Sequence, residues 1–384
     1  MNYVERKTNL MEIQQLLTSF SVVAILGPRQ CGKTTIAKKI NNQHYFDFEN
    51  PIDLAKFENP QLLLEKLSGL IVIDEIQRKP EIFPILRYLV DNFPNQKYLI
   101  LGSASRDLIQ QSSESLAGRI AYYELSGFKI HELGKENLYN LWSRGGFPSS
   151  ILAKNNKISL TWREQYISTF LERDIPALGI KIPANTLRRF WMMISHYHGQ
   201  LLNYSELGRS FGISDMTVRK YIDILEGTFM IRILQPWFVN IGKRLVKQPK
   251  IYLRDSGIFH SLLSIENIKQ LQSNPKLGAS WEGFAIEISI MSIKNPANSI
   301  YFWKTHNGAE LDLYWQAKGK KWGIEFKYSD APKLTKSMNI AINDLSLSHL
   351  WVIYPGSEPY QLTENITVLP IKNISENWKY LEMD

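Results

Sequence analysis

The feature that most constrains this chain is a glycine-rich loop set between a buried strand and a helix. The stretch GPRQCGKTT, residues 27–35, follows the apolar run SVVAIL and precedes the helical pattern IAKKI. It fits G-x-x-x-x-G-K-[ST], a loop whose backbone N–H groups surround nucleotide phosphates. Its glycines let the backbone approach the phosphates, and the dipole of the following helix adds positive potential. The sequence therefore predicts a site for a nucleoside triphosphate.

Within this loop, Lys33 is predicted to reach the β- and γ-phosphates, and the Thr34 hydroxyl to hold Mg²⁺. Cys31 occupies a variable position of the motif, so we interpret it as a spectator whose alkylation would block nucleotide binding. A guanine-reading N-K-x-D motif does not occur in the sequence, which favours ATP over GTP. The residues assigned to nucleotide binding are Gly27, Pro28, Arg29, Gln30, Cys31, Gly32, Lys33, Thr34 and Thr35.

Two further strand-like segments end in polar residues. LIVIDEIQ places Asp74 and Glu75 at the end of an apolar run, where adjacent carboxylates have no use in a core. We expect Asp74 to organise Mg²⁺ and Glu75 to polarise the attacking water. KYLILGSAS ends in Ser103, with Ser105 close by. Ser103 is either a contact to the γ-phosphate or the lytic water, or a serine in an ordinary turn.

These motifs, together with the polar strand end GSAS and the segment SLAGR, resemble the AAA+ ATPases. The similarity is greatest to an archaeal and bacterial group with a C-terminal restriction-endonuclease-like domain. The segments RGGFP (144–148) and FLERDIP (170–176) also resemble that group. The resemblance implies Mg²⁺-dependent ATP hydrolysis. It also makes Arg119 a candidate arginine finger acting on a neighbouring subunit, and hence suggests a homo-oligomer. The alternative is an Arg that satisfies carbonyls at a helix end.

Length and composition indicate a multi-domain intracellular protein. A chain of 384 residues is expected to form two or three domains. A single cysteine excludes a disulfide framework and favours a cytoplasmic location. The charged N-terminus predicts neither a signal peptide nor a membrane anchor, and no later apolar run approaches the length of a membrane span.

The segment NYSELGRSFGISDMTVRKYIDILEGTFMI predicts a helix, a tight turn and a second helix. Gly212 permits the turn, and Ser214 or Asp215 caps the second helix. Opposite the apolar face of that helix lie polar and basic side chains that would enter a major groove: Thr217, Arg219 and Lys220.

Two strand-like runs follow, IRILQPWFV and KIYL, separated by basic residues without an intervening acid. This pattern is typical of the wing of a winged helix that contacts nucleic-acid phosphates. The net charge of +8 is moderate, and its placement in this segment, more than its size, indicates a DNA partner. A winged helix can also be a protein-docking platform or a rigid spacer. The candidate wing contacts are Lys243, Arg244 and Lys247, and Lys250 continues the basic series.

The last third of the chain carries a second set of charged residues on two predicted strands, AELDLYWQ and KWGIEFKYS. Residues two apart on a strand share a face, so Glu310 would point with Asp312, and Glu325 with Lys327. If the two strands form a hairpin, Asp312 and Glu325 can converge on one divalent ion with Lys327 beside the activated water. Glu282, on the preceding amphipathic helix, is a further available carboxylate.

This order of residues is similar to the PD-(D/E)xK nucleases. By that resemblance, Asp312 and Glu325 would bind Mg²⁺ or Mn²⁺, Lys327 would stabilise the nucleophile and Glu282 would assist. The same fold also serves as a scaffold without cleavage, so both readings stay open. His196 and His198 lack partners at ligand spacing, which argues against a metal there. Asp255 is interpreted as a helix cap.

The sequence thus predicts an α/β protein with an AAA+ core (1–135), a helical lid or linker (136–200), a winged helix-turn-helix (201–250) and a nuclease-like domain (251–384). ATP binding would change the lid angle and hence the presentation of the C-terminal domains. Two functions follow: an ATPase that acts on nucleic acid, with or without metal-dependent cleavage, or an ATP-dependent protein-docking switch with an inert nuclease-like scaffold.

Overall fold

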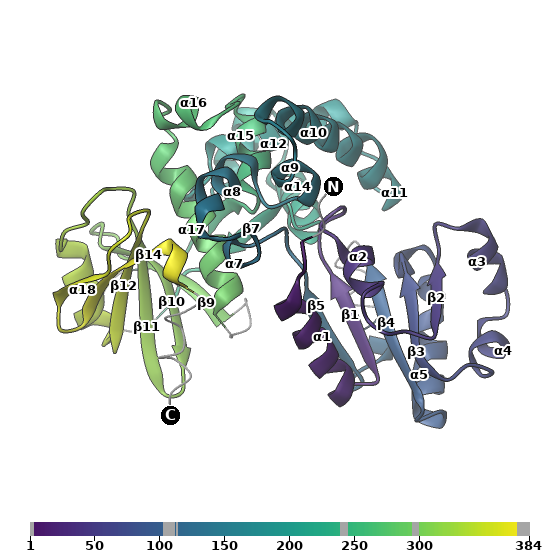
Figure 1. Ribbon diagram of the computed structural model, residues 1–384. Coiled ribbons are helices and arrows are strands. Elements are labelled where there is room, and N and C mark those ends of the chain that lie inside the picture. Colours follow the sequence, from purple (N-terminus) through teal and green to yellow (C-terminus); the bar gives the residue numbers. More distant parts are fainter. Residues whose placement is uncertain (1–3, 103–111, 113, 239–244, 294–298, 375–384) are drawn as a thin grey trace. The chain divides into compact units, whose positions relative to one another are not determined.

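The structure, a computed structural model, describes residues 4–102, 112, 114–238, 245–293 and 299–374. The chain divides into two compact units. The first comprises residues 1–128 and 223–230, and the second comprises 129–222 and 231–384. Both are α/β units, as the ribbon in Figure 1 shows.

The first unit contains a parallel sheet in the order β2-β3-β4-β1-β5. Its strands are β1 (Val22–Leu26), β2 (His44–Asp47), β3 (Gly69–Asp74), β4 (Gln96–Gly102) and β5 (Ile120–Glu124). The connections contain α1 (Lys7–Ser19), α2 (Lys33–Ala37), α3 (Pro51–Lys56), α4 (Pro60–Leu64), η1 (Ile76–Arg78), η2 (Pro80–Ile82) and α5 (Phe83–Asn92). A parallel sheet needs cover on both faces, which explains why β1 is buried along its whole length.

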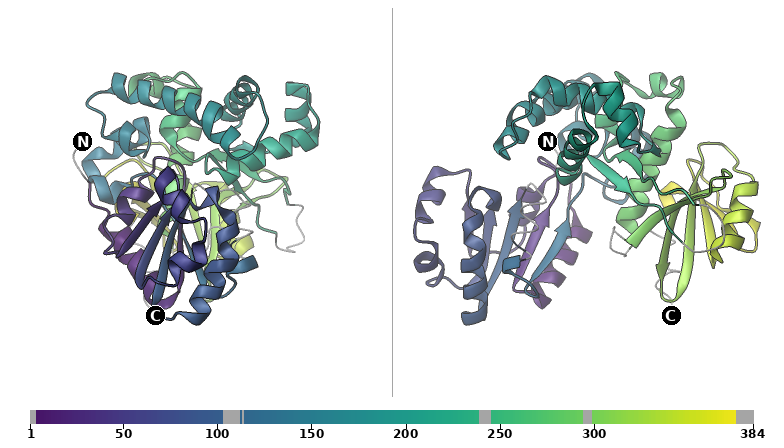
Figure 2. Two further views of the ribbon diagram at one scale, coloured as in Figure 1. Left: turned by 90° about the vertical axis from the view of Figure 1, so that its right-hand side faces the viewer. Right: turned by 180° about the vertical axis from the view of Figure 1, so that it is seen from behind.

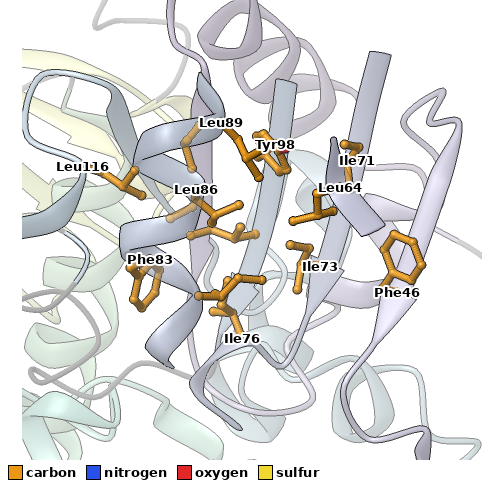
Figure 3. Close-up of a cluster of buried hydrophobic side chains, with 14 of the residues drawn as sticks. Phe46, Leu64, Ile71, Ile73, Ile76, Phe83, Leu86, Leu89, Tyr98 and Leu116 are labelled. Atoms are coloured by element: carbon orange, nitrogen blue, oxygen red, sulfur yellow. The ribbon is translucent and has the colours of Figure 1, made fainter. Parts of the chain in front are cut away.

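The core of this unit lies between the sheet and α5. Alternate residues of β3, such as Ile71 and Ile73, face the apolar side of α5, which contributes Phe83, Leu86 and Leu89 (Figure 3). Prolines near the starts of α3, α4 and α5 suit the first helical turn, where a missing N–H costs nothing. This packing fixes the strand ends from which the functional loops emerge.

The second unit begins with a group of helices. These are α7 (Ile130–Leu133), η3 (Lys135–Asn137), α8 (Leu138–Arg144), α9 (Pro148–Ile151), α10 (Asn156–Thr169), the π-helical turn η4 (Phe170–Asp174), α11 (Ile175–Ala177), α12 (Ala184–His196), α15 (Ser256–Leu262) and α16 (Ile268–Gln272). Asp255 caps α15 through the Ile258 N–H at 2.8 Å, which confirms the capping prediction. Asp255 also accepts a hydrogen bond from the Gly146 N–H at 2.8 Å, so it holds the RGGFP segment (144–148) in place.

Along the chain, two further helices come between α12 and α15. They are α13 (Tyr204–Phe211) and α14 (Asp215–Gly227), which are joined by a tight turn. Gly212 adopts φ +70°, the left-handed conformation that the turn requires. A three-stranded sheet accompanies them, with β6 (Gln200–Leu201), β7 (Ile231–Leu234) and β8 (Lys250–Leu253) in the order β6-β8-β7. The last residues of α14 belong to the first unit and its beginning to the second.

The C-terminal part of the second unit is a six-stranded mixed sheet in the order β13-β14-β12-β11-β10-β9 (Figures 1 and 2). Its elements are α17 (Leu277–Ser292), β9 (Ile300–Lys304), β10 (Glu310–Ala317), β11 (Lys320–Phe326), α18 (Lys336–Leu345), β12 (His349–Tyr354), β13 (Tyr360–Thr363), β14 (Ile366–Pro370) and η6 (Ile371–Asn373). Strands β9, β10 and β11 are antiparallel neighbours, and β12 is parallel to β11. The hairpin β10–β11 expected from the sequence is therefore present.

Candidate functional site

The predicted nucleotide residues meet at one edge of the parallel sheet. The glycine-rich loop follows β1 and Asp74 ends β3, so both lie at the carboxyl ends of their strands. The Thr34 hydroxyl donates to Asp74 Oδ2 at 2.7 Å. A hydroxyl and a carboxylate in contact form a small oxygen-donor set, which fits a Mg²⁺ ion held together with triphosphate oxygens.

Lys33 lies folded over the loop, with only 6% of its surface exposed. Its Nζ donates to the carbonyl oxygens of Gly27 and Pro28, each at 2.9 Å. These acceptors are neutral, so a phosphate oxygen would be the stronger partner for the ammonium.

Glu75 leaves the strand in a left-handed conformation, with φ 55°. Its own N–H donates to Asp74 Oδ1 at 2.9 Å, and its carboxylate contacts Gln77. Burial raises the pKa of Glu75, although the charges of Lys33 and Arg29 oppose the shift. A raised pKa and a strained backbone are common where a carboxylate serves as a base.

Three polar side chains at this edge escaped the sequence analysis. The Tyr45 hydroxyl donates to Asp74 Oδ2 at 2.7 Å, so it shares this acceptor with Thr34. Glu49 accepts from the Arg29 guanidinium at 2.7 Å and lies 3.5 Å from that of Arg78. The signal available for Tyr45 was its place near the end of the strand that neighbours β3.

Gly27 is required for a reason other than phosphate approach alone. It adopts φ +157°, and a Cβ there would lie 2.1 Å from the Leu125 carbonyl oxygen. Gly32, with φ +103°, has open space around its Cβ position, so conformation and not crowding favours glycine. The loop is thus tightly packed on its inner side and open near the start of α2.

Cys31, interpreted from the sequence as a spectator, has a packing role within the loop. Its side chain is fully buried, and its Sγ donates to the Leu125 carbonyl at 3.3 Å. A buried thiol is a poor target for alkylation. Cys31 is therefore part of the inner packing of the loop, and the effect of its alkylation on nucleotide binding stays a prediction.

Arg6, whose role the sequence did not reveal, ties the loop to the segment after β5. Its buried guanidinium donates to the carbonyls of Cys31 at 3.2 Å, Ser126 at 3.0 Å and Gly127 at 3.2 Å. It also lies 5.2 Å from the ring centroid of Phe128. One side chain thus joins the glycine-rich loop to the last residues of the first unit.

Arg119 lies at the opposite edge of the sheet. It directly precedes β5, and its carbonyl accepts from the Val22 N–H at the start of β1. Its guanidinium forms two hydrogen bonds with Asp91, from Nε at 2.6 Å and Nη2 at 2.9 Å. Arg119 is therefore not part of the site in its own chain. Ser103 and Ser105 lie outside the described residues.

The predicted nucleic-acid residues have different surroundings. Thr217 Oγ1 lies 2.9 Å from the Ser214 hydroxyl, and the Thr217 N–H donates to that hydroxyl at 3.2 Å, so Ser214 caps α14. The Arg219 guanidinium stacks 3.9 Å above the Tyr204 ring. Lys220 and Lys247 are exposed, whereas Lys243 and Arg244 lie outside the described residues.

In the second unit, the predicted acidic residues do come together, around a lysine that the sequence placed with the basic wing. Lys250 Nζ lies 3.2 Å from Glu282 Oε1 and 3.6 Å from Asp312 Oδ1, and it contacts Glu310 Oε1. Burial opposes its charge, but Tyr252 and the carboxylates outweigh that effect and raise the pKa of Lys250. Lys250 is buried within the fold, so its assignment to a phosphate-contacting series is wrong.

Glu325 and Lys327 pair with each other beside this cluster, with Lys327 Nζ 2.6 Å from Glu325 Oε1. Asp312 Oδ2 accepts from the Phe326 N–H at 2.9 Å. Burial, together with the nearby charge of Glu325, raises the pKa of Asp312. Across the described ranges, no group of three or more His, Cys, Asp or Glu residues is arranged to hold a metal ion.

The sequence argued against metal binding by His196 and His198, and the structure gives His198 hydrogen-bond partners within the fold. His198 Nδ1 accepts from the Leu253 N–H at 2.9 Å, and its Nε2 lies 3.1 Å from the Ala279 carbonyl. Burial lowers the pKa of His198 to about 3. It is therefore a neutral core histidine.

No helix among the described residues is both long enough and apolar enough to cross a membrane.

Comparison with known proteins supports these assignments in part. Residues 19–134 match the family model of an AAA domain. Residues 135–269 and 277–374 match two models described as domains of unknown function, DUF8612 and DUF4143. The first unit is therefore a P-loop domain of the AAA type, and the comparisons give no activity for the rest.

Relatives that match almost the whole of this chain occur in mycobacteria. The uncharacterized proteins Rv2008c of Mycobacterium tuberculosis and Mb2031c of Mycobacterium bovis are each 45% identical over 375 residues, covering 97% of this chain and 85% of the relative. An uncharacterized protein of Haemophilus influenzae is 24% identical over 295 residues, covering 66% of this chain and 72% of that protein. Among solved structures, the Walker-type ATPase PABY2304 of Pyrococcus abyssi gives a TM-score of 0.49 at 14% identity, covering 68% of this chain and 96% of that one.

Proposed function

Since the chain belongs to the family of AAA-domain proteins that includes Rv2008c of Mycobacterium tuberculosis, we propose that it is a Mg²⁺-dependent ATPase whose nucleotide cycle is coupled to nucleic-acid binding. The observation that carries the ATPase assignment is the Thr34–Asp74 hydrogen bond at 2.7 Å, with Lys33 and Glu75 from the same two loops beside it. It joins the phosphate loop to the acidic strand end.

Each residue has a defined task in this proposal. Lys33 would exchange the Gly27 and Pro28 carbonyls for phosphate oxygens, and Thr34 and Asp74 would hold the metal ion. When bound, Mg²⁺ neutralises charge on the β- and γ-phosphates. Glu75, kept basic by its buried setting, orients a water for attack in line with the leaving group.

Steady-state ATP turnover tests the assignment. Glu75→Gln should lower kcat by about 10²- to 10⁴-fold, the usual contribution of a general base, while ATP still binds. Glu58→Gln, an exposed carboxylate of the same unit, is the matched control and should keep full turnover. If Glu75→Gln hydrolyses ATP as fast as the unmodified chain, the hydrolytic role of Glu75 is refuted.

The nucleic-acid part of the proposal rests on α13, α14 and the three strands that accompany them. The succession α12, β6, α13, α14, β7 and β8 is the element order of a winged helix, with α14 in the place of the recognition helix. Arg219 and Lys220 lie on α14, and Lys247 lies in the β7–β8 connection. We therefore assign to them contacts with DNA phosphates.

Binding of duplex DNA at increasing salt tests this step. Each lost phosphate contact lowers the slope of log K against log salt by about 0.9, so Arg219→Glu with Lys220→Glu should lower it by about 2. Lys269→Glu reverses an exposed charge elsewhere in the second unit and should leave the slope unchanged. DNA stimulation of ATP turnover should disappear with the same pair of substitutions.

One observation favours a second candidate function, an ATP-dependent protein-docking switch. Met216, on the first turn of α14, leaves 80% of its surface exposed beside the basic residues. Exposed methionine is adaptable and is frequent at protein-binding surfaces. If the charge reversals on α14 leave DNA affinity unchanged, while Met216→Ser abolishes binding to a protein partner, the docking function replaces the nucleic-acid one.

The C-terminal elements support a restriction-endonuclease-like fold as part of the proposal. Helix α17, the antiparallel strands β9, β10 and β11, helix α18 and the parallel strand β12 follow one another in the order of that core. A fold does not carry an activity with it, so cleavage must be judged from the site itself.

A further inference from the structure

The acidic cluster of the C-terminal domain consists of Glu282, Glu310, Asp312 and Glu325. We infer that it is a structural clasp, a set of ion pairs that ties two parts of the fold together, and that its cation is the Lys250 ammonium. On this inference the cluster does not work as a divalent-metal nuclease centre. The inference concerns the second unit alone and does not depend on ATP hydrolysis. It rests on where Lys250 lies, what it contacts and which elements those contacts join.

The Lys250 ammonium occupies the middle of the cluster. It touches Glu282 on α17 and both Glu310 and Asp312 on β10, and only 3% of its surface is exposed. The Tyr252 hydroxyl donates to the same Glu282 oxygen at 2.6 Å. Three carboxylates from two elements thus converge on one nitrogen that carries a permanent positive charge.

The carboxylate oxygens of the cluster suit a divalent ion less well than they suit the Lys250 ammonium. Mg²⁺ and Mn²⁺ need several oxygen ligands around one point, and an ammonium already takes the oxygens of Glu282, Glu310 and Asp312. Lys327 takes one oxygen of Glu325, and the Phe326 N–H takes the other oxygen of Asp312. Of the carboxylate oxygens of these described residues, Glu325 Oε2 alone is fully buried without a hydrogen-bond partner, and a single oxygen is not a metal cage.

Charge balance leads to the same conclusion. Four carboxylates, those of Glu282, Glu310, Asp312 and Glu325, face the ammonium groups of Lys250, Lys327 and Lys304, the last of which pairs with Glu310. Their formal sum is −1, obtained from four negative and three positive charges. A cluster that is so nearly neutral offers little attraction for a further divalent ion.

The contacts of Lys250 also have a mechanical consequence, because they join two sheets. Lys250 begins β8 of the three-stranded sheet, whereas its partners belong to α17 and β10 of the C-terminal domain. A second ionic contact repeats this connection: Arg232 of β7 and Arg254, just after β8, both bind Glu287 of α17.

Backbone hydrogen bonds continue the connection. The Trp237 N–H bonds to the Phe302 carbonyl, the Phe302 N–H to the Gln235 carbonyl at 3.0 Å, and the Val246 N–H to the Lys304 carbonyl at 3.1 Å. The described residues of the β7–β8 connection thus meet β9 and the residue after it through two isolated bridges, Pro236 with Phe302 and Leu245 with Thr305. The three-stranded sheet that accompanies α13 is thereby attached to the C-terminal domain.

Binding of Mn²⁺ alone, without nucleotide, to the purified full chain tests the inference. The unmodified protein should bind no Mn²⁺ that depends on Asp312, so Asp312→Asn should leave the isotherm unchanged. Lys250→Met removes the ammonium but keeps an unbranched side chain as far as Cε. That variant should gain a Mn²⁺ site and lose it again when Asp312→Asn is added.

Thermal unfolding gives a second readout. In EDTA, Lys250→Met should unfold about 5–10 °C below the unmodified chain, because it leaves buried carboxylates without their cation. Mn²⁺ should restore most of that loss. Lys269→Met, at an exposed lysine of the same unit, is the matched control and should not respond.

Two results would overturn the inference. If the unmodified chain binds one Mn²⁺ that Asp312→Asn abolishes, the cluster is a metal site with Lys250 present. If Lys250→Met unfolds at the same temperature as the unmodified chain, Lys250 is not a clasp. Should Lys250→Met fail to fold, the Mn²⁺ comparison of the unmodified chain with Asp312→Asn still decides the metal question, and the failure to fold itself supports the clasp.

Discussion

Lys33 and Lys250 are both buried lysines close to carboxylates, yet their partners differ in a way that separates a ligand site from a structural one. The Lys33 ammonium is held by two backbone carbonyls, which are neutral acceptors of its own loop. The Lys250 ammonium is held by three carboxylates from two other elements. A triphosphate can outcompete the carbonyls, whereas an incoming ion must break charge-assisted contacts to displace Lys250.

The comparison teaches that residue types in a familiar order are not enough to identify a working site. At the edge of the parallel sheet, the Asp74 carboxylate is held by the hydroxyls of Thr34 and Tyr45, which are neutral donors. In the C-terminal domain, Asp312 and Glu325 are already satisfied, apart from one oxygen, by groups of the chain. What distinguishes the two sites is whether the cation comes from the protein or from a ligand.

Substituting each of the two lysines and measuring both variants side by side is the strongest test of this difference between the sites. Lys33→Ala should weaken ATP binding by about 10- to 100-fold, since a charge-assisted contact to phosphate is lost, with little change in unfolding temperature. Lys250→Met should do the reverse and preserve ATP affinity while lowering stability. A fluorescent ATP analogue and a thermal melt measure the two quantities on the same samples.

Lys66→Ala removes an exposed lysine of the first unit and serves as the reference for both measurements. If Lys250→Met loses ATP affinity to the same degree as Lys33→Ala, the two sites are not separate and the comparison fails.

The second ionic contact of the clasp predicts a defined pH dependence. Burial opposes ionisation of Glu287, but the guanidinium groups of Arg232 and Arg254 outweigh it and lower its pKa from 4.5 to about 2. A carboxylate whose folded pKa is lowered adds stability that is complete above its unfolded pKa and is lost as the pH falls through the folded one. This lowering of the Glu287 pKa, from 4.5 to about 2, corresponds to about 3 kcal/mol of stability at neutral pH.

Glu287→Gln should therefore lower the free energy of unfolding by about 3 kcal/mol at pH 7, with a deficit about half as large at pH 3. Denaturant titrations at both pH values measure the deficit. The buried histidines are present in both chains, so their titration cancels in the difference. Glu266→Gln, an exposed carboxylate, should show no deficit at either pH. A deficit that is constant with pH would mean that Glu287 stabilises by packing and not by charge.

Arg6 supports the phosphate loop from a position outside every nucleotide-binding motif, so substituting it tests whether that support contributes to ATP binding. Its guanidinium holds the Cys31 carbonyl of the phosphate loop and two carbonyls after β5. Arg6→Ala should lower the free energy of unfolding by about 2 kcal/mol and weaken ATP binding, because the loop loses a fixed support. Arg6→Lys should not restore both, since an ammonium lacks the planar fork that reaches three oxygens.

Lys7→Ala, next in sequence and exposed, is the control for Arg6→Ala. Stability that falls while ATP affinity stays constant would show that Arg6 supports the fold without positioning the loop.

The sequence was informative where the chemistry is local. The phosphate loop, the acidic end of β3 and the cap formed by Asp255 each lie within a few residues of the signal that identifies them. The hairpin β10–β11 was predictable for the same reason, because a short turn sets its partners. These elements and their parallel or antiparallel neighbours follow from patterns of fewer than about ten residues.

The sequence was misleading where long-range packing decides. Lys250 stands in a basic run, yet its partners lie 32 to 62 residues later in the chain, and no local pattern announces them. Cys31 occupies a variable motif position, but its thiol packs against Leu125. Arg6 lies outside every motif and nonetheless touches the phosphate loop. In each of these cases the tertiary contact, and not the neighbouring sequence, sets the role.

The smallest effect in a single chain is expected at Arg119, whose finger role stays a prediction. Arg119 pairs with Asp91 on the edge of the sheet away from the phosphate loop, so Arg119→Ala should leave ATP affinity and unfolding temperature unchanged. If Arg119 completes the site of a neighbouring copy, turnover per chain should rise with protein concentration, and Arg119→Ala should abolish the rise. Asp91→Ala, which frees the guanidinium, should preserve it. Turnover that is independent of concentration and insensitive to Arg119 would leave the Asp91 ion pair as the whole role of this residue.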